Sequence, residues 1–191
     1  MQSAQFNSPL HLALRPHYAN GGRAGGPALL LACGNSLRRD DGVGLKIAEA
    51  AEHLFPASRL RIVAAQQFLP EMAAELAETE LAIFVDACAA GEPGAIRVVP
   101  VAAERESPDH PIEPIAGSPG APAWETHRLD PPTLLAMAQS LCGHAPAHAF
   151  ALTIGAGCFA YGEEISGPLR QAVPRALRLL TNLVAAFSPQ A

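Results

Sequence analysis

Short apolar runs alternate with amphipathic segments along most of the chain. The runs at Ala28–Cys33 and Leu81–Val85 are continuously apolar, which is typical of sheet strands covered on both faces. After the first run, apolar residues recur at helical spacing from Val43 to Leu54. The pattern predicts strands over Ala28–Cys33, Arg59–Ala64, Leu81–Val85, Ala95–Val101 and Phe150–Ile154. It predicts helices over Val43–Leu54, Glu71–Glu78, Pro131–Leu141 and Pro168–Phe187.

The order of these elements predicts the fold class. Alternating strands and helices are typical of α/β proteins, so we expect a single domain with a twisted, mainly parallel β-sheet of about five strands and helices on both faces. Pro174 should kink the last helix or move its start. Residues 1–27, which include a glycine-rich stretch, are predicted to form a flexible N-terminal extension ahead of an α/β domain over residues 28–191. We therefore expect Met1–Gly26 to be dispensable.

Composition excludes several classes of partner. The 191 residues include 13 basic and 18 acidic side chains, a net charge of -5, whereas a nucleic-acid binder normally carries a basic stripe. No apolar run approaches the ~18 residues of a membrane span. The four cysteines form no C-x-x-C pair, and the start of the chain does not have the pattern of a secretion signal. We expect a cytoplasmic monomer that binds neither nucleic acid nor membrane.

Candidate chemistry is expected at the carboxyl ends of the strands, where ligands bind in open α/β sheets. The first strand is followed by Gly34-Asn35-x-Leu37-x-x-Asp40-Asp41-Gly42-Val43-Gly44. Asp40 is interpreted as a helix N-cap, and Asp41 as a helix-dipole partner or a site residue. A phosphate-binding loop is disfavoured, because the segment has no Gly-Lys-Ser/Thr end and its two carboxylates would repel a phosphate.

Two further residues fall at comparable positions. Asp86 ends the third apolar strand, where a buried carboxylate is costly unless it is paired, protonated or bound to a metal. Asp86 could also simply bond to a neighbouring backbone turn, and His127, just before the third helix, could be a capping or surface histidine. Together with Asp41 they suggest a site of oxygen and nitrogen ligands for a divalent transition metal. Metal binding and acid–base catalysis both remain possible.

These residues resemble the motifs of the hydrogenase maturation endopeptidases. Members of that family remove a C-terminal extension from the large subunit of nickel–iron hydrogenase after nickel has been inserted. The resemblance runs from about Leu29 to Phe187, and Thr153–Gly157 and Gly162–Ser166 are similar to a late strand and turn of the family. Some members carry Asp-Gly-Gly-Thr after the second strand. The segment here, Ala65–Glu71, looks more like the subset that serves cytosolic, NAD-linked hydrogenases.

The resemblance implies an endopeptidase with a defined site and partner. Asp41, Asp86 and His127 take the positions of the metal ligands, and Asp41 and Asp86 are the candidate catalytic residues. The implied partner is the nickel-loaded large-subunit precursor, and the nickel is carried by the substrate and bound only transiently. Either that nickel or a carboxylate would activate the water. Because Asp40 is interpreted as a cap and Asn caps nearly as well, Asp40→Asn should matter less than replacement of Asp41, Asp86 or His127.

Two other functions are compatible with the same residues. One is a non-catalytic checkpoint protein that binds the nickel site of the precursor through Asp41, Asp86 and His127 without cutting it. The other is a small-molecule metallohydrolase with its own bound metal. Release of a peptide from the precursor separates the endopeptidase from the first alternative, and stoichiometric metal in the purified protein would favour the second.

Overall fold

The computed structural model describes residues 26–103 and 129–187. These residues form β1 (Ala28–Cys33), the 3-10 turn η1 (Arg39–Gly42), α1 (Val43–Leu54), β2 (Leu60–Ala65), α2 (Met72–Leu76), β3 (Leu81–Cys88), β4 (Ile96–Pro100), α3 (Pro131–Cys142), β5 (His148–Gly155) and α4 (Gly167–Phe187). Each strand and helix predicted from the apolar pattern is present, with ends shifted by a few residues.

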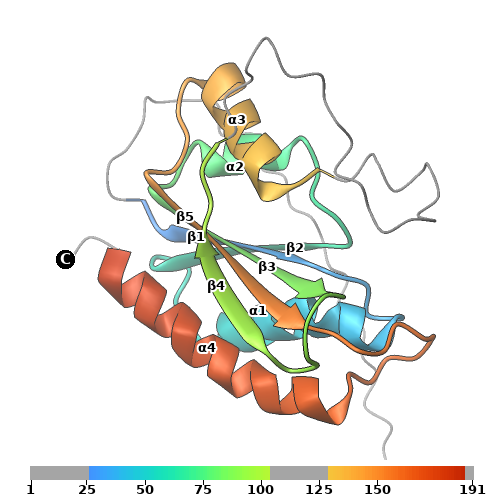
Figure 1. Cartoon of the computed structure of the whole chain (residues 1–191). Coiled ribbons are helices and arrows are strands. Elements are labelled where there is room, and N and C mark those ends of the chain that lie inside the picture. Colours follow the sequence, from blue (N-terminus) through green and yellow to red (C-terminus); the bar gives the residue numbers. More distant parts are fainter. Residues whose placement is uncertain (1–25, 104–128, 188–191) are drawn as a thin grey trace, which may run out of the picture.

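The strands form one five-stranded sheet in the order β2-β1-β3-β5-β4. All neighbouring strands are parallel except β4, which lies at one edge and runs antiparallel to β5. Helices α1 and α4 cover one face of the sheet, and α2 and α3 cover the other (Figure 1). The predicted α/β fold with a mainly parallel sheet is therefore confirmed.

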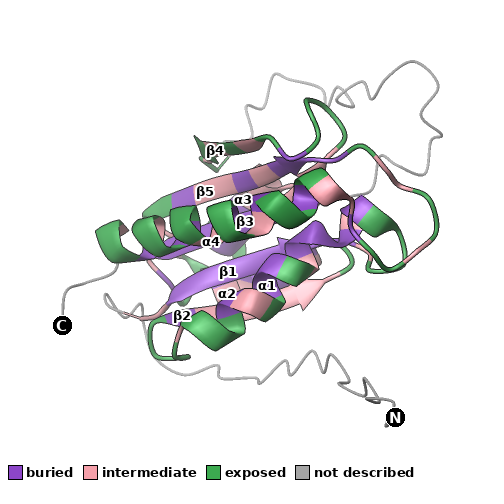
Figure 2. Ribbon diagram, turned by 90° about the horizontal axis from the view of Figure 1, so that it is seen from below, coloured by how far each residue is buried: buried purple, intermediate pink, exposed green. Residues whose placement is uncertain are grey.

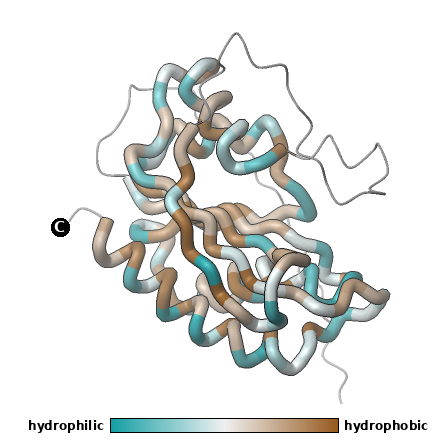
Figure 3. The backbone as a smooth tube through the Cα atoms, viewed as in Figure 1, coloured by the Kyte–Doolittle hydropathy of each residue, from teal (hydrophilic) through white to brown (hydrophobic). Residues whose placement is uncertain are grey.

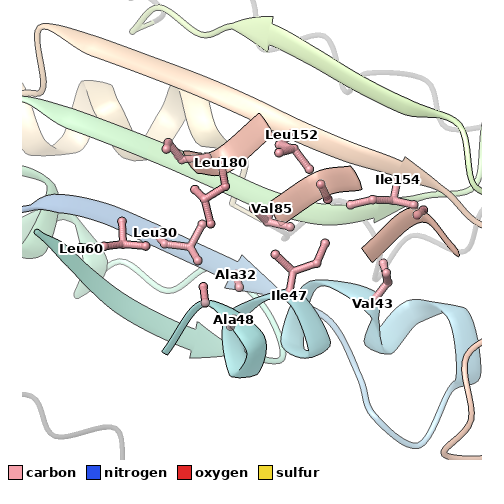
Figure 4. Close-up of a cluster of buried hydrophobic side chains, with 14 of the residues drawn as sticks. Leu30, Ala32, Val43, Ile47, Ala48, Leu60, Val85, Leu152, Ile154 and Leu180 are labelled. Carbon is pink, nitrogen blue, oxygen red and sulfur yellow. The ribbon is translucent and has the colours of Figure 1, made fainter. Parts of the chain in front are cut away.

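The alternation of side chains along each strand divides the core into two clusters. Leu30 and Ala32 of β1 face α1 and α4, whereas Leu29 and Leu31 face α2 and α3. Figure 4 shows the first cluster, and Figure 3 shows the hydrophobic stretches concentrated in the strands. Full burial of one such leucine stabilises the fold by roughly 1.5–3 kcal/mol. Figure 2, viewed from below, shows that β1 is buried and that the exposed residues of the helices lie on the side away from the sheet.

Two of the differences from the sequence-based prediction concern Asp86 and Pro174. Strand β3 continues three residues beyond Val85, because Asp86 pairs with Thr153 and Cys88 with Gly155 across the neighbouring β5. Asp86 therefore lies inside a strand rather than after it. Helix α4 begins at Gly167 and runs through the exposed Pro174, which does not move the start of the helix. The buried face of α4 extends on both sides of the proline, so its packing on the sheet favours one continuous helix.

Two predicted features lie outside the described residues, namely most of the N-terminal extension and His127. The described chain starts just ahead of β1, where the hydroxyl of Thr79 donates to the carbonyl of Pro27 at 2.8 Å. None of the helices in residues 26–103 and 129–187 has the length and hydropathy needed to span a membrane.

Candidate functional site

The connection from β1 to α1 lies across the carboxyl ends of the central strands. A Cβ atom on Gly44 would collide with the carbonyl oxygen of Cys33 and would lie 3.1 Å from that of Val85. The start of α1 thus rests directly on the ends of β1 and β3, which only glycine permits. This close approach brings Asp41, three residues earlier in the chain, to the same edge of the sheet as Asp86.

Asp41 is held by the turn that precedes it. One carboxylate oxygen of Asp41, Oδ2, accepts the backbone N–H of Asn35 at 3.0 Å. The side chain of Asn35 in turn accepts the N–H of Leu37 at 2.9 Å, which closes an Asx turn. The side chain of Asp41 is thereby oriented, and the residue remains partly exposed. An oriented, solvent-accessible carboxylate can bind a metal or accept a proton.

Asp86 lies in an open cavity of about 210 Å³. Its Oδ1 accepts the backbone N–H of Ala87 at 2.8 Å, which fixes the direction of the carboxylate. The cavity is lined by residues from the ends of β1 and β3, from the segment after β2, and from the start of α3: Cys33, Gln67, Phe68, Asp86, Leu129, Asp130 and Pro131. A space of this volume is large enough for several waters, each about 30 Å³, or for one substrate side chain.

Sequence reasoning assigned no role to two polar residues of this cavity. Asp130 is the N-cap of α3, and its Oδ1 accepts the N–H of Thr133 at 2.9 Å. An Asp directly before Pro131-Pro132 is a helix-start signal, so the cap was detectable from sequence, although its place beside Asp86 was not. Gln67 follows β2, and only the tertiary structure places it in the cavity.

The interpretation of Asp40 as a helix cap is wrong. The N-cap of α1 is Gly42, which has no side chain to make a capping hydrogen bond. Asp40 is instead fully buried, with 0% of its surface exposed. Oδ2 accepts the N–H groups of Gly157 and Cys158 at 3.0 and 2.9 Å and the hydroxyl of Ser166 at 3.1 Å, while Oδ1 accepts the N–H of Ser166 at 2.7 Å.

These four hydrogen bonds join η1 to the connection between β5 and α4, residues 156–166, which lies beside the start of α1 in Figure 1. Burial alone would raise the pKa of Asp40, but the donors from Ser166, Gly157 and Cys158 outweigh burial and hold the pKa below its ordinary value. Asp40 is therefore a charged structural group. We refer to Asp40 with Gly157, Cys158 and Ser166 as the Asp40 clasp.

The structure brings two of the three predicted ligands to one edge of the sheet, namely Asp41 and Asp86. The third, His127, lies outside the described residues, so its part in the site stays a prediction. Within residues 26–103 and 129–187, no three His, Cys, Asp or Glu side chains are placed to hold one metal ion together.

The domain has the fold of solved hydrogenase maturation endopeptidases. The endopeptidase HybD from E. coli is 18% identical, with a TM-score of 0.58 over 84% of this chain and 94% of its own. The [NiFe] hydrogenase maturation protease HycI from Thermococcus kodakarensis KOD1 is also 18% identical, with a TM-score of 0.57 over 85% and 94%. The corresponding HybD from Thermococcus kodakarensis is 20% identical, with a TM-score of 0.55 over 83% and 99%.

These similarities confirm, at the level of the fold, the resemblance inferred from the motifs. No protein-family model matches the chain. No curated protein matches it by sequence either.

Proposed function

We propose that this protein is an endopeptidase that removes the C-terminal extension of a nickel–iron hydrogenase large-subunit precursor after nickel insertion. The observation that carries the proposal is the position of Asp41 and Asp86. Both carboxylates of the family-like motifs lie at the carboxyl edge of a sheet with the fold of the HybD and HycI proteases, and Asp86 lines an open cavity there.

Nickel belongs to the substrate in this proposal. Asp41, Asp86 and His127 would contact the metal transiently, and the contact would distinguish loaded from unloaded precursor. Carboxylate and imidazole groups suit a divalent transition metal. Substrate nickel would supply Lewis acidity beside the scissile bond. The backbone N–H groups of Asn35 and Ala87 hold the two carboxylates in position before the substrate arrives.

Hydrolysis then needs one base. Asp86 or Asp41 takes a proton from water, and the water oxygen bonds to the carbonyl carbon of the scissile peptide. The C–N bond breaks, and the leaving nitrogen takes the proton back from the carboxylic acid. The products are the mature subunit, with a new carboxyl terminus, and the released extension. Asp40 takes no part in these steps, because its oxygens are occupied by four donors.

Intact-mass spectrometry of a precursor incubated with this protein tests the proposal. The precursor is taken from the organism that encodes the chain and is presented with and without nickel. We expect the mass of the extension to be lost only from nickel-loaded precursor and only with active protein. Binding without cleavage would favour the checkpoint alternative, and the absence of both would reject the proposal.

Elemental analysis of the purified protein tests the metallohydrolase alternative. A metal carried by the substrate predicts less than one equivalent of any transition metal in the isolated protein. Stoichiometric metal that survives dialysis would contradict that expectation and favour a resident catalytic ion.

A further inference from the structure

An exposed patch of unusual composition lies beside the candidate site. It consists of Leu37, Arg38, Arg39 and Tyr161, and we call it the Arg–Tyr patch. Tyr161 is 82% exposed and Leu37 is 53% exposed, so two large apolar groups face solvent together. The guanidinium of Arg38 lies 5.3 Å from the centre of the Tyr161 ring, in cation–π contact. Exposed apolar groups gathered in this way are typical of interaction sites.

The backbone beneath the patch is fixed. The N–H of Arg39 donates to the carbonyl of Gly162 at 2.8 Å, and the N–H of Gly162 donates to the carbonyl of Leu37 at 3.0 Å. Nη1 of Arg38 donates to the carbonyl of Phe159 at 3.3 Å. The hydrogen bonds of the Asp40 clasp join the same two parts of the chain, η1 and residues 156–166. A patch organised before binding loses little conformational entropy when a partner docks.

The charges of the patch favour an anionic partner. Among the described residues, neither Arg38 nor Arg39 lies within ion-pair distance of a carboxylate, although Glu163 and Glu164 follow Tyr161 closely in sequence. Both arginines are exposed on a chain whose net charge is -5. Two guanidinium groups that have no carboxylate partner among the described residues, beside an aromatic ring, match a peptide that brings a carboxylate and an apolar side chain.

We infer that the Arg–Tyr patch docks the C-terminal extension of the precursor. The inference rests on the proposed function. Leu37, Arg38 and Arg39 belong to the same β1–α1 connection as Asp41, and the N–H of Asp41 donates to the carbonyl of Arg38 at 3.1 Å. The part of the substrate adjoining the scissile bond therefore lies within reach of it. A C-terminal segment always ends in a carboxylate, which the arginines bind, while Leu37 and Tyr161 contact its apolar side chains.

Fluorescence anisotropy with a labelled synthetic peptide tests the inference without requiring cleavage. The peptide spans the scissile bond and the extension, with a free carboxyl terminus. We expect Tyr161→Ser to raise its Kd about tenfold, and Leu37→Ser and Arg39→Asn to raise it about two- to fivefold each. Asn is chosen at position 39 because Arg39 has φ 47°, which Asn tolerates better than most residues.

Matched controls lie elsewhere on the surface. Leu54→Ser changes a leucine that is 58% exposed at the far end of α1, and Arg178→Asn removes an exposed charge from α4. Neither control should change the Kd. A second peptide has an amidated C-terminus and amides in place of its acidic side chains, so it cannot form an ion pair with Arg39. With this peptide, Arg39→Asn should leave the Kd unchanged.

The outcomes separate this inference from the proposed function. Tight binding that depends on the patch, without cleavage of the nickel-loaded precursor, supports docking and rejects the protease. Cleavage with the same Kd for patch variants and controls supports the protease and overturns the docking inference. Failure of the wild-type protein to bind the peptide at any soluble concentration also overturns it.

Discussion

Two neighbouring carboxylates of η1 lie in opposite surroundings. Asp40 is fully buried and accepts four hydrogen bonds from the described residues, whereas Asp41 is partly exposed and accepts a single backbone N–H from them. Asp86, on β3, also lies at an open cavity, where its Oδ1 accepts the backbone N–H of Ala87. The comparison teaches that hydrogen bonding and exposure, rather than residue type or sequence position, separate a structural carboxylate from a candidate catalytic one.

Asp86→Asn should have the largest effect on activity. Asn retains the shape of the side chain and can still accept the N–H of Ala87, but it cannot act as a base or carry the charge that holds a cation. We expect processing of nickel-loaded precursor to fall by about 10²–10⁴-fold. The melting temperature should stay equal or rise, because a partly buried charge is removed. A processing rate near that of the wild type would contradict the role given to Asp86.

Asp40→Asn should show the opposite pattern, with a large loss of stability. Both oxygens of Asp40 accept hydrogen bonds, whereas Asn has one oxygen and one NH₂ group. The NH₂ group would face an N–H donor, so at least one hydrogen bond of the clasp would be lost. We expect the free energy of unfolding to fall by roughly 2–4 kcal/mol in urea titrations. Ser166→Ala removes only the hydroxyl donor and should cost about 1 kcal/mol. If Asp40→Asn unfolds like the wild type, the clasp does not stabilise the fold.

The pH dependence of stability sharpens the same comparison. The pKa of Asp40 is lowered in the folded protein, so the unfolded chain takes up this proton at higher pH than the folded one. The stabilisation by ionised Asp40 is therefore complete above the ordinary value of 3.8 and is lost as the pH falls through the folded value. The difference in unfolding free energy between wild type and Asp40→Asn should be constant from about pH 7 to pH 5 and shrink below that range. A difference that does not change down to the acid unfolding of the protein would refute this assignment.

Deletion of residues 1–26 should have the smallest effect, and it removes neither of the two carboxylates. Its glycine-rich composition predicts little buried surface. Processing and the melting temperature should both match the full chain. A clear drop in either measurement would mean that this segment contributes to the domain or to substrate binding.

Much of the fold was predictable because its signals are local. Strands β1 and β3 are buried on both faces of the sheet, so their sequences are continuously apolar. Helix α1 is buried on one face, so its apolar residues recur at helical spacing. The end of β3 was missed because a strand usually stops at a charged residue. Asp86 instead continues the ladder opposite Thr153, and that pairing depends on a segment 67 positions later in the numbering.

The site was predictable only in part, for the same reason. The position of Asp41 and Asp86 at one edge of the sheet was predictable because the ends of parallel strands converge there, and their role in catalysis stays a prediction. Asp40 was misassigned because a helix cap is a local signal, while its actual donors are 117–126 residues away. Gln67 and Asp130 share a cavity with Asp86 only through tertiary packing, so their sequence neighbours carry no sign of it.

Asp41→Asn separates the two roles, because Asp41 is the residue next to Asp40 of the clasp. Processing of nickel-loaded precursor and unfolding in urea are measured on the same preparation, beside Asp40→Asn. We expect at least a 100-fold loss of processing, with the unfolding free energy within about 0.5 kcal/mol of the wild type. Wild-type processing by Asp41→Asn, together with a folded but inactive Asp40→Asn, would contradict the division of roles between the two carboxylates.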